Sequence, residues 1–182
     1  MCEMPTEGRD RPSLSFLARF VGLLIVFYFL VAWRPINDAV IVPFTAGIAL
    51  VSGAILNMFG EQVAVSGTEI RAPTFAVNIE NGCNGIETVL LFGAAVLAFP
   101  ASAPRRALGF AVGFLSIQTL NLLRVVSLFW VGEHHPAFFF SSHTVVWQSV
   151  VVLFGVLLFL AWALWRRPAG RPAPVRSTGR KG

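Results

Sequence analysis

Three residues spread along the chain carry side chains that could do chemistry together: Cys83, Arg124 and His143. A cysteine thiolate is a nucleophile, and an imidazole accepts or donates a proton near neutral pH. A guanidinium stabilises a thiolate or a tetrahedral oxyanion. The set predicts a cysteine acyl-transfer site that attacks an amide bond and uses no cofactor.

Cys83 lies in the glycine-rich stretch Asn-Gly-Cys-Asn-Gly-Ile-Glu, just before an apolar run. Asn84 and Glu87 have the spacing of a helix N-cap and its N3 partner, and the positive end of a helix favours a thiolate. Gly82 and Gly85 allow close approach of a backbone or substrate. Two alternatives remain open: Cys83 as a small buried apolar residue, and Glu87 as a general base, although capping explains Glu87 more simply.

Arg124 lies within the apolar run Asn-Leu-Leu-Arg-Val-Val-Ser-Leu-Phe-Trp. An arginine inside a membrane span costs roughly 2.5–3.5 kcal/mol on insertion scales, which makes it a candidate functional residue. Gln118 and Asn121 precede it at three-residue intervals, so they share one helix face that should point inward. Asn121 is predicted to orient the guanidinium. The alternative is that Arg124 extends to the outer interface.

His143 follows three phenylalanines and two serines, and it is predicted to begin the last span. Ser141 or Ser142 is expected to cap that helix. An imidazole at this point can serve as acid or base.

His134 and His135 are rival histidines, but they precede Pro136 and are predicted to be solvated loop residues. With Glu133 they raise the alternative of a metal site. No HExxH or similar helical spacing supports one, so no metal is predicted.

The composition indicates a membrane protein. The 182 residues are 55% hydrophobic and only 13% charged, and the mean hydropathy is +0.71. A soluble domain of this length could not cover so much apolar surface. The net charge is +5, but the basic residues flank apolar runs, a pattern of membrane topology rather than of nucleic-acid binding. The two cysteines offer no disulfide framework.

The chain is predicted to form an all-α integral membrane helical bundle with a short extracytoplasmic β-hairpin. Segment 39–60 has one bulky and one small-residue side, which fits either an interfacial helix or a fifth crossing helix. The predicted segments are disordered cytoplasmic tails at 1–13 and 166–182, spans at about 14–33, 84–99, 107–131 and 144–165, and the hairpin at 61–82.

The distribution of basic residues distinguishes the two possible topologies. With four spans and both termini inside, eleven of the fourteen basic residues lie on the cytoplasmic side. If 39–60 also crosses, only nine do, so the positive-inside rule favours four spans. Both topologies place the hairpin, Cys83 and the 132–142 loop on the extracytoplasmic side.

Three short motifs in this order resemble the exosortase/archaeosortase family of membrane transpeptidases, most closely the exosortase H branch. They are Cys-Asn-Gly-Ile at 83–86, Asn-Leu-Leu-Arg at 121–124 and the single histidine at 143. The resemblance covers roughly residues 40–165. It implies catalytic roles for Cys83, Arg124 and His143.

The same resemblance implies the partners and the location. The substrates would be secreted proteins that end in a short motif of the Ile-Pro-Thr-Leu type, a transmembrane helix and a basic cluster. The enzyme would lie among lipids of the bacterial inner membrane, with no nucleic acid as partner. One rival hypothesis is a non-enzymatic transporter or assembly subunit in which Arg124 lines a polar path. Another is a lipid-modifying enzyme, for which the outer face has few basic residues.

Overall fold

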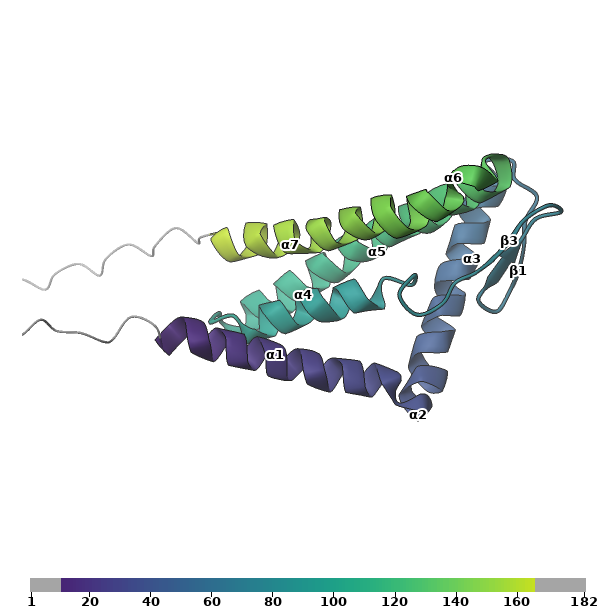
Figure 1. The fold of residues 1–182 in the computed structure, drawn as a ribbon. Helices are drawn as coiled ribbons and strands as arrows, with labels where there is room; N and C mark the ends of the chain where they lie inside the picture. The colour runs from purple at the N-terminus through teal and green to yellow at the C-terminus, as the bar shows by residue number, and fades with distance from the viewer. Residues whose placement is uncertain (1–10, 166–182) are drawn as a thin grey trace, which may run out of the picture.

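In the part of the chain that the structure describes, four helices run along the long axis of the molecule. The computed structural model describes residues 11–165, so residues 1–10 of the tail predicted at 1–13, and the whole tail predicted at 166–182, lie outside the described residues. The first of the four helices begins at Arg11, so the predicted tail is too long by three residues. The four are α1 (Arg11–Ala32), α4 (Ile86–Ala98), α5 (Ala103–His134) and α7 (Gln148–Leu164) (Figure 1).

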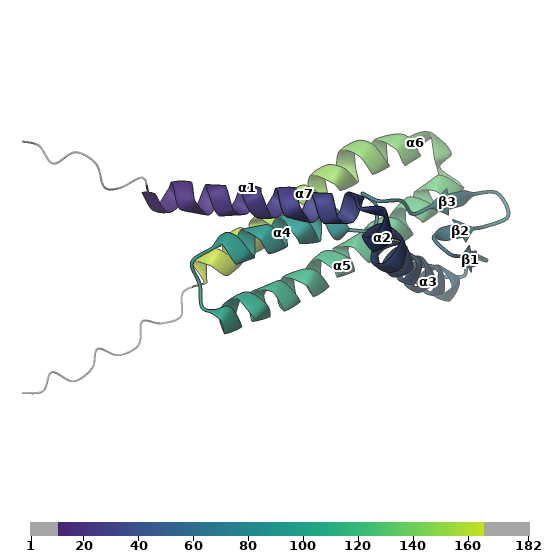
Figure 2. The same ribbon diagram turned by 90° about the horizontal axis from the view of Figure 1, so that it is seen from below.

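A fifth long helix lies steeply across the other four at one end of the molecule. After α2 (Arg34–Ile36) the chain forms a π-helical turn, η1 (Asn37–Ile41), and then α3 (Val42–Met58). Figure 1 shows α3 nearly at right angles to α1, and Figure 2 shows it almost end-on. The ends of the described chain lie together at the opposite end of the molecule. Together η1 and α3 cover the segment at 39–60 that was predicted to form either an interfacial helix or a fifth membrane-crossing helix.

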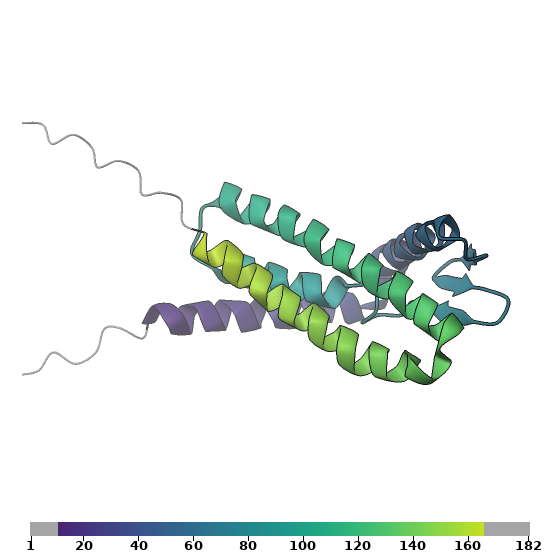
Figure 3. The same ribbon diagram turned by 90° about the horizontal axis from the view of Figure 1, so that it is seen from above.

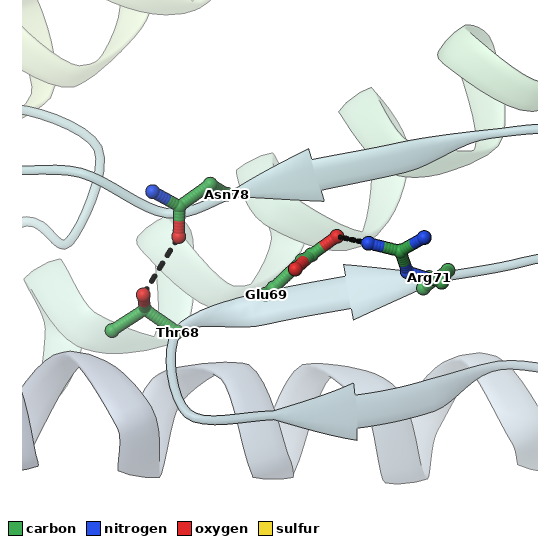
Figure 4. A network of polar contacts seen from close by, with 4 residues as sticks. All are labelled: Thr68, Glu69, Arg71 and Asn78. Atoms are coloured by element: carbon green, nitrogen blue, oxygen red, sulfur yellow. Dashed lines mark hydrogen bonds and ion pairs between the residues drawn. The ribbon is translucent and has the colours of Figure 1, made fainter.

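A small three-stranded antiparallel sheet lies beyond α3, where a two-stranded hairpin was predicted. The strands are β1 (Ala64–Ser66), β2 (Glu69–Arg71) and β3 (Ala76–Asn78), in the order β1-β2-β3. The turn predicted at Ser66-Gly67 is confirmed, with Gly67 at φ +58°. The central strand β2 was missed because two of its three residues are charged. The side chains of its first and last residues, Glu69 and Arg71, form an ion pair of 2.5 Å (Figure 4).

The last helical segment starts earlier than predicted. Helix α5 continues to His134, and α6 (Pro136–Ser141), η2 (Ser142–Trp147) and α7 follow with only His135 outside a helix. The predicted 132–142 loop is therefore wrong. Proline is well tolerated in the first turn of a helix, so Pro136 starts a helix here rather than extending a loop. Of the three phenylalanines after it, Phe139 packs against Phe75 edge-on, with ring centroids 5.5 Å apart, whereas Phe138 and Phe140 are exposed.

The predicted fold class is confirmed, but the spans differ in detail. Within residues 11–165, four helical stretches are long and apolar enough to cross a membrane: Leu14–Ala32, Arg34–Met58, Ala103–His134 and Pro136–Leu164. Helix α4, predicted as a span, has 13 residues, about 20 Å at 1.5 Å per residue. That is shorter than the hydrocarbon core of about 30 Å. The segment before α4 is therefore set back from the end of the molecule at which α5 terminates (Figure 1).

Helix α4 is the most buried of the axial helices and packs against α1, α5 and α7. Its Val89, Phe92 and Val96 form one core cluster with Ile117 of α5 and Trp162 of α7. A second cluster joins α3, the sheet and the end of α5 through Leu56, Ile70 and Phe129, among others. Cys83 packs against this second cluster, three residues before the start of α4, which contributes to the first one.

Candidate active site

The structure brings the three predicted site residues together. The Sγ atom of Cys83 lies 3.1 Å from Nε2 of His143, and Nη2 of Arg124 lies 4.0 Å from the same sulfur. The residues come from the turn before α4, from η2 and from α5, so 60 positions separate Cys83 from His143. Arg124 is only 2% exposed, and Cys83 is half-buried.

Two glycines shape the turn that presents Cys83. Gly82 and Gly85 have φ values of +91° and +78°, in the left-handed region that favours glycine. Between them the N–H of Cys83 donates to the carbonyl of Glu80 at 3.0 Å. Gly85 also lies directly against α5: a Cβ on this residue would be 3.0 Å from Cγ of Asn121 and 3.1 Å from Nε2 of Gln118. Close approach, predicted at both glycines, is thus strongest at Gly85.

Asn84 caps α4, but in a different way from the prediction. Its Oδ1 accepts a hydrogen bond from the N–H of Ile86 at 3.1 Å. The residue at the N-cap position is Gly85, so Glu87 occupies the second helical position rather than the third. The predicted capping box is therefore wrong, although the capping side chain was identified.

The other end of the Asn84 side chain ties the turn to α3. Its Nδ2 donates to Oγ1 of Thr45 at 2.9 Å, and Thr45 in turn donates to the carbonyl of Ile41 at 2.8 Å. Both side chains are buried, Asn84 at 1% and Thr45 at 3% exposed. A buried side chain with its hydrogen bonds satisfied holds a single geometry. Cys83 is thereby fixed relative to α3. No local sequence pattern indicated this link.

Arg124 reaches the same turn from α5. Its Nη1 donates to the carbonyl of Gly82 at 3.4 Å, beside the contact of Nη2 with Cys83. The inward polar stripe is confirmed, since Gln118 and Asn121 are both buried. The predicted role of Asn121 in orienting the guanidinium is not confirmed. Among residues 11–165, neither the Asn121 side-chain amide nor the Gln118 side-chain amide has a hydrogen-bond partner.

His143 lies inside the π-helical segment η2 and not at a helix start. The predicted serine caps are therefore wrong, since Ser141 and Ser142 are themselves helical. The imidazole stacks on the ring of Phe139, with centroids 6.0 Å apart and an interplanar angle of 14°. Phe139 was missed from the sequence because it stood in a predicted loop, four residues before the histidine on what is in fact one helical face.

A small cavity of about 220 Å³ opens at the three side chains. One wall is formed by residues 77–80, which comprise the end of β3 and its extension. The facing walls come from α5, α6 and η2, and apart from Arg124 and His143 they are apolar: Val125, Leu128, Phe129 and Phe139. The site is thus a slot whose polar residues are Cys83, Arg124 and His143, together with Asn78 and Glu80 on the 77–80 wall.

The predicted preference for a thiolate is reversed. Burial raises the pKa of Cys83 above its ordinary value; Arg124 acts to lower it, while Glu80 and Glu87 add to the increase. The thiol therefore keeps its proton at neutral pH. Since Nε2 of His143 lies within hydrogen-bonding distance of Sγ, the arrangement can transfer that proton when the sulfur attacks.

The other two histidines lie apart from this site. His134 stacks on Trp130, with centroids 4.8 Å apart, and its Nε2 is 3.7 Å from a carboxylate oxygen of Glu61. Both are exposed, as predicted, and His135 lies between α5 and α6, but His134 is the last residue of α5 and not a loop residue. Across the part of the chain that the structure describes, no three His, Cys, Asp or Glu side chains cluster as metal ligands.

The long apolar helices of the described residues define a multi-pass membrane protein. In a comparison with known protein families, residues 10–164 match the transmembrane exosortases. The chain therefore belongs to the exosortase family, as its motifs predicted. No curated protein and no solved structure matches it.

Replacing Gly85 with Ala should disturb the site more than replacing Gly60. Both positions have positive φ, so alanine costs roughly 1–2 kcal/mol at each. Only at Gly85 does the new methyl group also crowd Asn121 and Gln118, whereas nothing lies within 4 Å at Gly60. Thermal unfolding in detergent should show a larger fall in melting temperature for Gly85→Ala. Equal falls would contradict the close packing of this turn on α5.

The rate at which iodoacetamide labels Cys83 should keep rising with pH beyond the range in which an exposed cysteine levels off, because burial raises the pKa. Arg124→Gln removes the influence that lowers the pKa, so the midpoint should move to higher pH. Glu80→Gln removes one that raises it, so the midpoint should move to lower pH. Shifts of the opposite sign would refute this electrostatic assignment.

Proposed function

We propose that the protein is a membrane-embedded cysteine peptidase or transpeptidase that cleaves the C-terminal sorting signal of secreted proteins through an acyl-enzyme at Cys83. The observation that carries the proposal is the contact of 3.1 Å between the Cys83 sulfur and the His143 imidazole, with the Arg124 guanidinium 4.0 Å from the same sulfur. Nucleophile, base and oxyanion stabiliser are the three parts that such a reaction needs.

The first half-reaction begins with the neutral thiol. His143 accepts the proton of Cys83 as Sγ attacks the carbonyl carbon of the scissile peptide bond. The oxyanion that forms is stabilised by Arg124, whose charge is worth more in a buried site than in water. The tetrahedral species collapses when His143 returns the proton to the leaving nitrogen, and this step releases the C-terminal part of the signal.

The second half-reaction removes the acyl group from the enzyme. An amine, or water, attacks the thioester carbonyl, the carbon–sulfur bond breaks, and the proton of the nucleophile returns to Sγ through His143. An amine gives transpeptidation and water gives hydrolysis. The same base and the same oxyanion stabiliser serve both halves.

The proposed orientation places Cys83 on the extracytoplasmic side of a bacterial inner membrane. The ends of the described chain would then face the cytoplasm, and so would eleven of the fourteen basic residues, as the positive-inside rule favours. Helix α3, which crosses the axial helices, would lie near the outer interface. The transmembrane helix of the substrate would approach laterally from the lipid, so that its preceding motif enters the slot at Cys83.

The test is the processing of a secreted reporter that ends in an Ile-Pro-Thr-Leu motif, an apolar helix and an arginine cluster. Cys83→Ala and Cys83→Ser should lower the cleavage rate by at least about a thousandfold, the range seen when a catalytic nucleophile is removed. Full-length reporter should then accumulate in the membrane, as measured by immunoblotting.

Cys2→Ser is the matched control, because Cys2 is the other cysteine of the chain and should be dispensable. Arg124→Lys should retain more activity than Arg124→Ala, since it keeps the charge. Normal processing by Cys83→Ala, together with loss of function in Arg124→Ala, would support the non-enzymatic alternative in which the arginine lines a polar path.

A further inference from the structure

Strand β3 is an edge strand, and it lies on the side of the sheet that faces the candidate active site. The strand order is β1-β2-β3. Figures 2 and 3 show the sheet between α3 and the junction of α5 with α6, and Figure 2 shows β1 toward α3 and β3 toward α6. The outer edge of β3 thus borders the space that holds Cys83, Arg124 and His143.

The hydrogen-bond pattern shows which main-chain groups lie on that edge. The N–H of Ile79 donates to Thr68 at 3.0 Å, and the carbonyl of Phe75 accepts from Ala72 at 2.8 Å. Main-chain groups alternate between the two sides of an antiparallel strand. The main-chain groups of Phe75 and Ile79 point toward β2, so the main-chain groups of Ala76 and Asn78 point away from it. Within residues 11–165 no backbone group pairs with the main chain of Ala76 or Asn78.

The cavity lies along this edge. Residues 77–80 form one of its walls, and the chain continues from them through Gly82 to Cys83 on the same cavity. Its volume of about 220 Å³ is below the roughly 300–1,000 Å³ typical of sites that enclose a drug-sized ligand. A slot of this size, with unpaired main-chain donors and acceptors on one wall, suits a short extended peptide.

We propose that the substrate's recognition segment binds as an added strand along the outer edge of β3, with its scissile carbonyl at Cys83. Main-chain hydrogen bonds to Asn78 and Ala76 would then hold the peptide in register with the sulfur, a mode of recognition known as β-augmentation. The inference rests on the proposed function and adds to it how the substrate is bound.

An added strand also constrains the side chains of the substrate, because they alternate between the two faces of the sheet. On one face lie Val77 and Ile79, which pack with Phe129 in the core. On the other lie Asn78, whose Oδ1 accepts a hydrogen bond of 2.7 Å from Thr68 (Figure 4), and the exposed Glu80. The accepted segment should therefore alternate apolar residues with polar or basic ones.

The test compares Asn78→Pro with Asn78→Ala in the full chain in detergent. Both variants lose the side chain, but only proline removes the N–H at the edge. This N–H takes no part in the ladder with β2, so proline is tolerated there. The probes are acetyl-Val-Thr-Val chloromethyl ketone and chloroacetone. Each alkylates a thiol: the sulfur–carbon bond forms, chloride leaves, and the thiol proton passes to His143 or to water.

The measured quantity is the ratio of the Cys83 alkylation rates for the peptide reagent and chloroacetone. The ratio should exceed one in the wild type and in Asn78→Ala, and fall by roughly three- to tenfold in Asn78→Pro, as expected for one lost hydrogen bond. In the wild type, the backbone nitrogens of the peptide reagent can also be methylated one at a time. Methylation should slow the alkylation of Cys83 only at every second nitrogen. This series decides the question even if Asn78→Pro does not fold.

The outcomes separate the two proposals. If Cys83 is alkylated but the peptide reagent has no advantage, or N-methylation acts without alternation, the added strand is refuted and the nucleophile stands. If neither reagent alkylates Cys83 in the folded wild type, the proposed function fails, and the inference fails with it.

Discussion

The buried charge of Arg124 is the constraint on which the rest of the site depends. A guanidinium that is 2% exposed inside a helical bundle needs hydrogen-bond acceptors, and it finds them in the Gly82 carbonyl and the Cys83 sulfur. The turn before α4 must therefore lie against α5 with its backbone exposed to the arginine. Two glycines with positive φ make that approach possible. A residue that is costly in the membrane thus fixes the position of the only thiol in the described chain.

The short length of α4 creates the room for this arrangement. Because α4 begins only at Ile86, the preceding turn is set back within the bundle, where it meets the middle of α5 and the π-helical segment η2. Asn84 and Thr45 lock the turn from the side of α3. Phe139 supports the imidazole from the opposite side. Burial then keeps the thiol protonated, so that a base in contact with the sulfur is needed for reactivity.

Much of this could be predicted from residue types, because membrane burial makes polar residues conspicuous. Arg124, with Gln118 and Asn121 on the same face, indicated an inward polar stripe, and the glycines around Cys83 indicated a tight turn. The Thr45–Asn84 bond could not be predicted, since it joins residues 39 positions apart and depends on how α3 crosses the bundle. The start of the last helix was misplaced because Pro136 suggested a loop. The tendency of Cys83 to ionise was overestimated because the sequence showed the nearby helix N-terminus but not the burial that raises the pKa of the thiol.

Capture of the covalent intermediate would test the proposed role of Cys83 as nucleophile. The full chain should be mixed with a membrane-anchored substrate that carries the sorting signal, quenched rapidly in acid and analysed by peptide mass spectrometry. If Cys83 is the nucleophile, the peptide that contains it should gain the mass of the acyl part of the substrate, and hydroxylamine should release that group, as expected for a thioester. Efficient cleavage of the substrate with no adduct on Cys83, or with an adduct on another residue, would show that Cys83 is not the nucleophile.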